Sequence, residues 1–304
     1  MYDNNSVMAS QLGVNKVFLW STPRCVSTAF AKCMSFVDAI QIVHEPYLCA
    51  FLLDVARDKP QNPTEQEKMI DDRTYEVLDP SVDAGESFDE KTCTFSWIKD
   101  ELLSEKHYPD KKIIFCKDVA HHLAGKYDML PEGFKYSFAI RHPAKVYMSL
   151  KILLTRFYGG EIDLLKLPLF PSGFGYKELS DLVDYVRLNL DPTPTIVDTD
   201  DLLADPSGIL PVYCEKTGIP YSDTLLSWPA GSDIVKQWKI AKYLVKGDKL
   251  LGFYKAAFES TEFLKPEPPP VIDTLPEDVQ KCVKATLGYY DKLRKDRISA
   301  LPRK

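Results

Sequence analysis

The sequence predicts a three-layer α/β/α fold in which a central, mainly parallel sheet is covered by helices on both faces. Short apolar runs rich in β-branched and aromatic residues recur along the chain, and segments with helical spacing of apolar residues separate them. Strands that alternate with helices are typical of parallel sheets, because each parallel connection needs a crossover. A sheet of this kind binds its ligand beyond the carboxyl ends of its strands.

In the first half of the chain, apolar runs of strand length precede segments of helical periodicity. The runs 17–20 (VFLW) and 40–44 (IQIVH) predict strands, and they lead into helices expected at 27–36 and 47–57. Residues 58–92 are acidic and polar, with one exposed helix expected at 65–78, and we interpret them as a surface insertion. A helix expected at 93–106 then precedes a third strand at 112–116.

In the second half, strand 136–141 is followed by a helix at 144–157, since Pro143 suits the first turn of a helix, where a missing N–H costs little. The loop 159–175 is apolar and punctuated by Gly and Pro, and its length suits a lid or pocket wall. The expected single domain 1–304 continues with a helix at 176–190 and a strand at 195–198. It ends with a stiff connector at 265–271 (KPEPPPV) and a final helix at 277–298. The final helix is expected to pack through Val279, Val283, Leu287 and Leu293.

Composition narrows the classes of function. The net charge of −6 and pI near 5.5 argue against non-specific binding to nucleic acid or to an acidic membrane, so any anion site must be local. The seven cysteines are scattered and form no C-x-x-C pair, which argues against a disulfide framework or a zinc site. No run of 18 apolar residues occurs. We therefore expect a soluble, cytoplasmic protein, if no leader has been removed.

The stretch 16–30, KVFLWSTPRCVSTAF, carries the most information. An apolar strand ends in a polar loop that opens onto a helix, and this geometry presents free backbone N–H groups to a phosphate. The loop contains one cation, Arg24, and several hydroxyls suited to a polyanion. It contains no glycine and no Gly-Lys-Ser/Thr ending, so it differs from the usual loop for nucleoside triphosphates.

A second anion site is predicted after strand 136–141. Arg141 lies at the strand tip and Ser149 about two turns into the next helix, so the two can converge only on a group held across that edge. A guanidinium and a hydroxyl suit a phosphate. The alternative is an arginine that neutralises a neighbouring carboxylate and a serine that fills a helix face.

The two motifs, STPRCVST and RHPAKVYMS, together resemble those of sulfotransferases that use 3′-phosphoadenosine-5′-phosphosulfate (PAPS). SWPAG and FESTEF resemble segments of poorly characterised sulfotransferase-like proteins, including plant members of aminotransferase-like description. The resemblance implies a P-loop-like nucleotide fold and sulfation of a hydroxyl, less often an amine, on a small acceptor, and the apolar residues of the expected pocket favour a lipophilic one. PAPS is the implied donor, adenosine 3′,5′-bisphosphate (PAP) the product, and no metal is required.

The resemblance also implies which residues bind the nucleotide. Arg141 and Ser149 would hold the 3′-phosphate. The phosphosulfate would lie on the first loop, formed by Thr22, Pro23, Arg24, Cys25, Val26, Ser27 and Thr28. Cys25 replaces the usual Ser, and Arg24 stands where the family often has Lys, so it would act as a charge clamp and not as an acid. The family's late Arg-Lys-Gly segment is missing, which leaves Lys236, Lys239 and Lys242 as weak candidates for a third support.

A base must accept the acceptor's proton. Glu45, after strand 40–44, is the first candidate, and a glutamate whose pKa burial raises towards neutrality would suit this role. Its alternative role is a carboxylate at a helix N-terminus. His44 is a second candidate. After the third strand Lys117 matches the family's Lys-Thr-His motif, but Asp118 and Val119 replace Thr-His. A base from this strand could therefore come only from His121 or His122, and at most one of the two is expected to face the site.

The acceptor pocket is expected between the segment after the second strand and the loop 159–175. Its candidate walls are aromatic and aliphatic: Tyr47, Phe51, Phe157, Tyr158, Leu169, Phe170, Phe174 and Tyr176. Core packing would explain these residues equally well. A small-molecule acceptor is the expected partner, and the oligomeric state stays open.

Two other functions compete with sulfuryl transfer. A small-molecule kinase on a related P-loop fold would need the Gly-Lys-Ser/Thr ending that this loop lacks. A non-catalytic protein that binds PAP or another nucleotide would keep the phosphate motifs without a working base.

Overall fold

The computed structural model describes residues 13–57, 87–89, 92–167 and 170–300, and a parallel six-stranded sheet forms its centre. The strand order is β5-β4-β1-β3-β2-β6, and every neighbouring pair is parallel. The strands are β1 Asn15–Ser21, β2 Ile40–His44, β3 Ile113–Val119, β4 Lys135–Ile140, β5 Thr195–Asp198 and β6 Lys239–Ile240. The five expected strands are confirmed, and the two-residue β6 was not predicted.

The helices of the first half differ from expectation in one place. The expected helices at 27–36 and 47–57 are α1 Ser27–Met34 and α2 Pro46–Arg57. The segment expected as one helix at 93–106 forms three short pieces instead, α4 Phe95–Trp97, the π turn η3 Ile98–Leu102 and the 3₁₀ turn η4 Glu105–His107. The wider π turn allows Ile98, Leu102 and Leu103 all to be buried, so tertiary packing overrides the regular helix. Two further 3₁₀ turns follow, η5 Ala120–Leu123 and η6 Tyr127–Met129.

The second half contains more helix than the sequence predicted. The expected helices are α5 Pro143–Tyr158, with Pro143 in its first turn, and α6 Tyr176–Asn189. The final helix, α11 Glu277–Arg294, buries Val279, Val283 and Leu293 and ends four residues early, because Ile298 donates its N–H to Ile196 of β5. The elements that were not predicted are η7 Leu164–Lys166, α7 Thr199–Ala204, α8 Pro206–Thr217, η8 Asp223–Leu226, η9 Asp233–Gln237, α9 Lys242–Leu251, α10 Lys255–Glu259 and η10 Ile272–Thr274.

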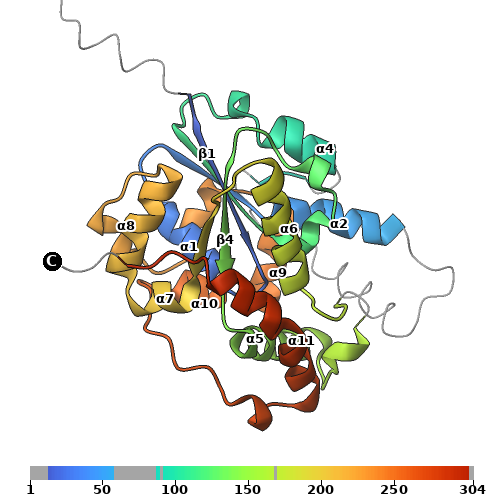
Figure 1. Ribbon diagram of the computed structural model, residues 1–304. Coiled ribbons are helices and arrows are strands. Elements are labelled where there is room, and N and C mark those ends of the chain that lie inside the picture. Colours follow the sequence, from blue (N-terminus) through green and yellow to red (C-terminus); the bar gives the residue numbers. More distant parts are fainter. Residues whose placement is uncertain (1–12, 58–86, 90–91, 168–169, 301–304) are drawn as a thin grey trace, which may run out of the picture.

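Helices cover both faces of the sheet (Figure 1). On one face Phe30 of α1 packs against Tyr213 of α8, with ring centroids 4.7 Å apart. On the other, Trp20 of β1 packs against Tyr47 of α2 at 5.5 Å. Residues Val17–Trp20 of β1 are all fully buried, as expected for a central parallel strand that is covered on both faces. The predicted three-layer α/β/α class is therefore confirmed.

The register of the sheet brings the ends of four strands to one edge. His44 is level with Lys117, and Trp20 is level with Asp118. Ser21, the last residue of β1, is level with Ala139, so Arg141 follows two residues further along β4. The described residues do not include most of the expected insertion 58–92, nor the exposed helix expected at 65–78 within it. They also do not include residues 168–169 of the expected lid loop.

Candidate active site

The loop between β1 and α1 has an unusual backbone. Arg24 (φ 59°) and Val26 (φ 65°) both adopt the left-handed region, although neither is a glycine and Val is β-branched. Strain of this kind concentrates at functional sites, and successive turns of opposite hand direct N–H groups into an anion-binding nest. Val26 is also the N-cap of α1, and no side chain caps that helix end. The loop therefore offers backbone donors to an anion.

The neighbouring chain packs closely on this loop. Gly175, before α6, has φ 80°, and a Cβ at this position would lie 3.0 Å from Cδ of Pro23. Only a glycine fits such an approach in that conformation. The segment before α6 is thus held directly against the first loop.

Three side chains of the loop, those of Ser21, Thr22 and Cys25, are fully buried. Ser21 is buried, and its hydroxyl donates to the carbonyl of Asp118 at 3.1 Å and lies 3.3 Å from Oγ of Ser27. The buried hydroxyl of Thr22 hydrogen-bonds none of the described residues. Cys25 is fully buried, and its Sγ is directed at the carbonyl of Ala139 at 3.7 Å. Its side chain is therefore part of the core, and only its backbone could contact a ligand.

The structure brings Arg24, Ser149 and Arg141 together. Arg24 donates through Nε to Oγ of Ser149 at 3.0 Å and through Nη1 to the carbonyl of Phe253 at 2.9 Å. Arg141 donates through Nη1 to the carbonyl of Arg24 at 3.2 Å. Burial lowers the pKa of the Arg24 guanidinium, which nevertheless stays charged at neutral pH. The two motifs thus meet at Arg24, whose side chain contacts Ser149 and whose backbone carbonyl contacts Arg141.

Arg141 also lies near a carboxylate. Its Nε is 3.5 Å from Oδ1 of Asp200, but the same oxygen accepts a shorter hydrogen bond, 2.8 Å, from Lys145. The alternative role of Arg141, neutralising a carboxylate, is thus present in part. Since Lys145 already supplies a charge to Asp200, the guanidinium retains donors for an anion.

Glu45 is held at both oxygens. Lys117 forms a buried ion pair with Oε1, and the hydroxyl of Tyr254 donates to Oε2 at 2.6 Å. Burial alone would raise the pKa of Glu45, but the Lys117 ammonium, followed by His44 and His122, brings it below its ordinary value. The raised pKa that would suit a base is thus not found, because Lys117 reaches this carboxylate, which the sequence did not show. Glu45 also has a left-handed backbone, with φ 48°.

His44 is fully buried beside this pair. Its ring lies 4.9 Å from Trp238 and 5.1 Å from Tyr254, and neither ring nitrogen hydrogen-bonds a described residue. Burial lowers the pKa of His44 to about 3, so the imidazole is neutral at physiological pH. Its Nε2 lies 3.9 Å from Oε1 of Glu45.

The two adjacent histidines after β3 diverge. His122 bonds through Nδ1 to Oδ1 of Asp118 at 2.7 Å, and the other oxygen of Asp118 accepts the N–H of Tyr47 at 2.7 Å. His121 lies 3.0 Å from Oε1 of Glu178. Burial raises the pKa of Asp118. Each histidine therefore has its own acidic partner.

The aromatic residues expected to line an acceptor pocket lie in different places. Tyr47 is fully buried and donates its hydroxyl to the carbonyl of Met129 at 2.7 Å, so it belongs to the core. The rings of Phe51 and Phe174 both pack against the ring of His121, with centroids 4.9 and 4.6 Å from it. Phe157 and Tyr158 pack on each other at the end of α5. Tyr176 is fully buried.

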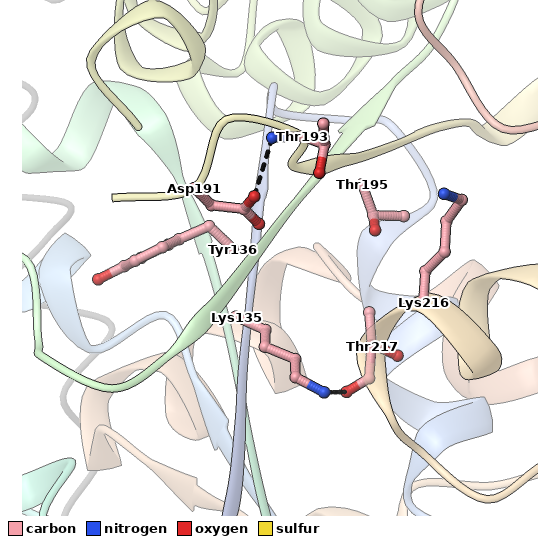
Figure 2. Close-up of a pocket in the computed structure, with 7 residues that line it drawn as sticks. All are labelled: Lys135, Tyr136, Asp191, Thr193, Thr195, Lys216 and Thr217. Atoms are coloured by element: carbon pink, nitrogen blue, oxygen red, sulfur yellow. Dashed lines mark hydrogen bonds between the residues drawn. The ribbon is translucent and has the colours of Figure 1, made fainter. Parts of the chain in front are cut away.

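Two hollows lie outside the cluster around Glu45. One, of about 280 Å³, lies between α5, α11 and the loop before α6, and its wall includes Phe170, Phe174 and Cys282. The other, of about 220 Å³, is polar and lies at the amino ends of β4 and β5, away from the carboxyl edge (Figure 2). Figure 2 shows Lys135 at this second hollow, where its ammonium donates to the carbonyl of Thr217 at 3.2 Å.

Sequence reasoning missed the segment between α9 and α10. Phe253 supplies the carbonyl on Arg24, and Tyr254 supplies the hydroxyl on Glu45. No motif marks these residues, and more than 200 positions separate Tyr254 from Glu45. The β2–β6 pairing, which was not predicted, helps to bring this part of the chain back to the site. Of the lysines considered as a third support, Lys236 pairs with Asp233 at 3.0 Å.

Several general features complete the description. All seven cysteines are unpaired. Within the described ranges, no three His, Cys, Asp or Glu side chains are grouped so as to hold a metal ion. None of the helices in these ranges combines the length and the apolar character needed to cross a membrane.

Comparison with known proteins finds similarity to sulfotransferase domains over part of the chain. Residues 181–297 match the family model of the sulfotransferase domain. The chain is 26% identical over 219 residues to branched-chain-amino-acid aminotransferase-like protein 2 of Arabidopsis thaliana, covering 71% of this chain and 32% of that protein. Protein 1 of the same name is 25% identical over 278 residues, covering 90% and 41%. The chain thus spans less than half the length of these relatives.

Among solved structures, the sulfotransferase domain of the Synechococcus PCC 7002 olefin synthase is similar at a TM-score of 0.46 and 16% identity, over 90% of this chain and 95% of that one. The resemblance to sulfotransferases predicted from the sequence is confirmed by the family-model match.

Proposed function

Because this chain carries a match to the sulfotransferase domain, we propose that it transfers a sulfuryl group from PAPS to the hydroxyl of a small acceptor. The observation that carries the proposal is the meeting of Arg24, Ser149 and Arg141 at one edge of the sheet. Two anion-binding motifs that meet in this way suit a nucleotide with phosphate groups at two positions, as PAPS has.

The first loop suits the phosphosulfate. Its left-handed residues Arg24 and Val26 and the uncapped start of α1 provide backbone donors, and Arg24 provides a charge close to them. The hydroxyls of Ser27 and Thr28 lie in the first turn of the helix. PAPS would supply an activated sulfuryl group on a phosphate leaving group. Arg24 would stabilise the negative charge that develops on that phosphate.

The second motif suits the 3′-phosphate. Arg141 and Ser149 both contact Arg24, so a phosphate that bound them would lie beside the first loop. Ser149 now accepts a hydrogen bond from Arg24, and its own hydroxyl hydrogen can turn to a phosphate oxygen. In this proposal Arg24 would face the phosphosulfate and Arg141 the 3′-phosphate.

Glu45 is the proposed base. Its lowered pKa keeps it ionised at neutral pH, so it is always in the form that accepts a proton. As the bond between sulfur and the acceptor oxygen forms and the bond from sulfur to the phosphate oxygen breaks, the acceptor's hydroxyl proton would pass to Oε2. Lys117 would keep the carboxylate in place through Oε1. His44 is the alternative base, since its imidazole is neutral and unpartnered among the described residues.

A small, lipophilic alcohol or phenol is the proposed acceptor class. Phe51 and Phe174 flank His121 near the carboxyl edge of the sheet, and Phe170 extends the aromatic surface to the 280 Å³ hollow. Such surfaces favour apolar ligands of modest size.

A non-catalytic nucleotide-binding role is the second candidate, and one observation favours it. Both oxygens of Glu45 already have partners in this structure, Lys117 and Tyr254. A base in that state must exchange one partner for the acceptor before it can take a proton. A protein that only binds PAP would not need that exchange.

One experiment separates these functions. Transfer of ³⁵S from labelled PAPS would be measured over a library of alcohols, phenols and amines, while calorimetry measures PAP binding. Labelled product from the wild-type protein, with none from Glu45→Gln, supports the enzyme. PAP binding without any labelled product supports the non-catalytic role, and an absence of PAP binding overturns both.

A further inference from the structure

Tyr254 completes the immobilisation of Glu45. Its hydroxyl lies 2.6 Å from Oε2, and Lys117 occupies Oε1, so the carboxylate has no freedom to rotate while both contacts persist. The backbone adds a third constraint, because the N–H of Glu45 donates to the carbonyl of Lys117 at 2.7 Å. Tyr254, Glu45 and Lys117 are all less than a tenth exposed. Hydrogen bonds of this kind are strongest when they are shielded from water.

Tyr254 is itself fixed by its own segment. Its N–H donates to Oδ1 of Asp248 at 2.6 Å, and the N–H of Gly252 donates to the carbonyl of the same aspartate at 2.7 Å. Gly252 adopts φ 63°, which ends α9 and turns the chain towards the site. The tyrosine ring packs edge-on against His44 at 5.1 Å and against Phe258 at 5.8 Å. The hydroxyl is therefore placed by the fold and not by a freely moving loop tip.

The helix that follows is anchored to α1. Lys32 is buried, and its ammonium donates to the carbonyls of Ala257, Phe258 and Ser260 at 3.3, 2.7 and 2.9 Å. These carbonyls belong to the end of α10 and the residue that follows it. The helix whose N-terminus is proposed to hold the phosphosulfate is thus connected to the segment that holds Glu45.

We propose that Tyr254 is a positioning residue of the reaction, which directs Oε2 of Glu45 through its hydroxyl hydrogen bond and yields that oxygen to the acceptor hydroxyl. The proposal rests on the sulfotransferase function proposed above. The carbonyl of the adjacent Phe253 accepts a hydrogen bond from Arg24, so two consecutive residues orient a group on the donor side and a group on the acceptor side.

The protonation of Glu45 depends on every charge around it. A hydroxyl that donates to a carboxylate favours its ionised form, so losing Tyr254 should make Glu45 easier to protonate. The other titratable or charged groups that face it come from β2, β3, the turn after β3, the first loop and α9: His44, Lys117, Asp118, His122, Arg24 and Tyr243. All of these remain in a Tyr254→Phe variant, so the variant isolates one hydroxyl.

The test compares Tyr254→Phe with a matched control, Tyr213→Phe. Tyr213 is also a fully buried tyrosine with a hydroxyl hydrogen bond, 2.9 Å to Oγ of Ser137, but it lies on α8 and touches none of the proposed catalytic residues. We expect Tyr254→Phe to lower kcat for ³⁵S transfer about tenfold, with the KM for PAPS and the Kd for PAP within twofold. The acid limb of its pH–rate profile should move to higher pH. Tyr213→Phe should change none of these values.

A second background makes the test specific. Glu45→Asp withdraws the carboxylate by one methylene, so its contact with Tyr254 is lost, and Tyr254→Phe should then cause no further fall in kcat. An equal fall in both backgrounds, or an unchanged pH profile, would overturn the proposal. Tighter PAP binding with faster turnover would also overturn it, because the segment would then only block the site.

The proposed function and this inference can fail separately. If wild-type protein does not bind PAP, the sulfotransferase function fails. The unfolding free energies of Tyr254→Phe, Glu45→Gln and the double variant still show whether the two residues are coupled. Additive effects in that cycle contradict the positioning role without bearing on PAP binding.

Discussion

The guanidinium of Arg24 donates through Nε to the hydroxyl of Ser149 at 3.0 Å, which joins two motifs that lie 125 residues apart in the sequence. The contact exists because β1 and β4 are neighbours in the sheet, so the loop after one strand meets the helix after the other. Arg141 reinforces the junction through the carbonyl of Arg24. Both proposed phosphate sites are therefore parts of one continuous surface.

PAP should raise the melting temperature of the protein more than ATP with Mg²⁺ does. A ligand at about 100 times its Kd adds about 2.7 kcal/mol to the stability of the folded state, which corresponds to several degrees for a chain of this size. Differential scanning fluorimetry with PAP, ATP and adenosine 5′-monophosphate measures this. An equal shift with the monophosphate would show that the 3′-phosphate is not recognised.

Arg141→Ala should weaken PAP binding at least tenfold, because the 3′-phosphate loses a charge-assisted hydrogen bond. Lys145→Ala is the control, since Lys145 shares the carboxylate of Asp200 with Arg141. Calorimetry should find the Kd of Lys145→Ala within threefold of wild type. Equal weakening in both variants would assign the effect to Asp200 and not to phosphate binding.

Glu45→Gln should abolish sulfuryl transfer and spare PAP binding, but it should also destabilise the protein. The substitution leaves the ammonium of Lys117, which is only 2% exposed, without its counter-charge. Removing one partner of a buried ion pair costs about 3 kcal/mol or more of the unfolding free energy. Urea denaturation measures this loss, and the double variant Glu45→Gln, Lys117→Met should recover part of it. If the double variant is no more stable, the pair contributes little.

The buried histidine should make the fold sensitive to mild acid. His44 has a folded pKa of about 3, well below its ordinary value near 6.5, so as the pH falls through this window the unfolded chain takes up a proton that the folded protein does not. The contribution of the neutral His44 to the unfolding free energy is therefore fully present above pH 6.5. Below that pH it declines, by up to about 1.4 kcal/mol per pH unit.

Urea denaturation at pH 7, 6 and 5 tests this expectation. His44→Phe keeps the packing against Trp238 and should decline less steeply than wild type. His107→Gln changes an exposed histidine and should follow the wild-type curve. Parallel curves for all three proteins would contradict the assignment of the acid sensitivity to His44.

The sequence by itself identified the parts that depend on local pattern. Apolar runs of strand length located β1 to β5, and the spacing of apolar residues located α1, α2, α5, α6 and α11. The polar loop after β1 and the Arg141–Ser149 pair were found because residue type and strand-end position are both visible in sequence. The short β6 and the π turn at Ile98–Leu102 were not predicted, since their reasons lie in tertiary packing.

Only the tertiary structure decided the electrostatics of the site. Glu45 was found from its place after β2, but its low pKa depends on Lys117, which the sheet register brings level with His44. Tyr254 left no signal in the sequence, because a lone tyrosine between two helices resembles any core aromatic until the chain folds back. Strand ends are specified by local composition, whereas ion pairs and hydrogen bonds between distant segments depend on atomic distances that exist only in the folded chain.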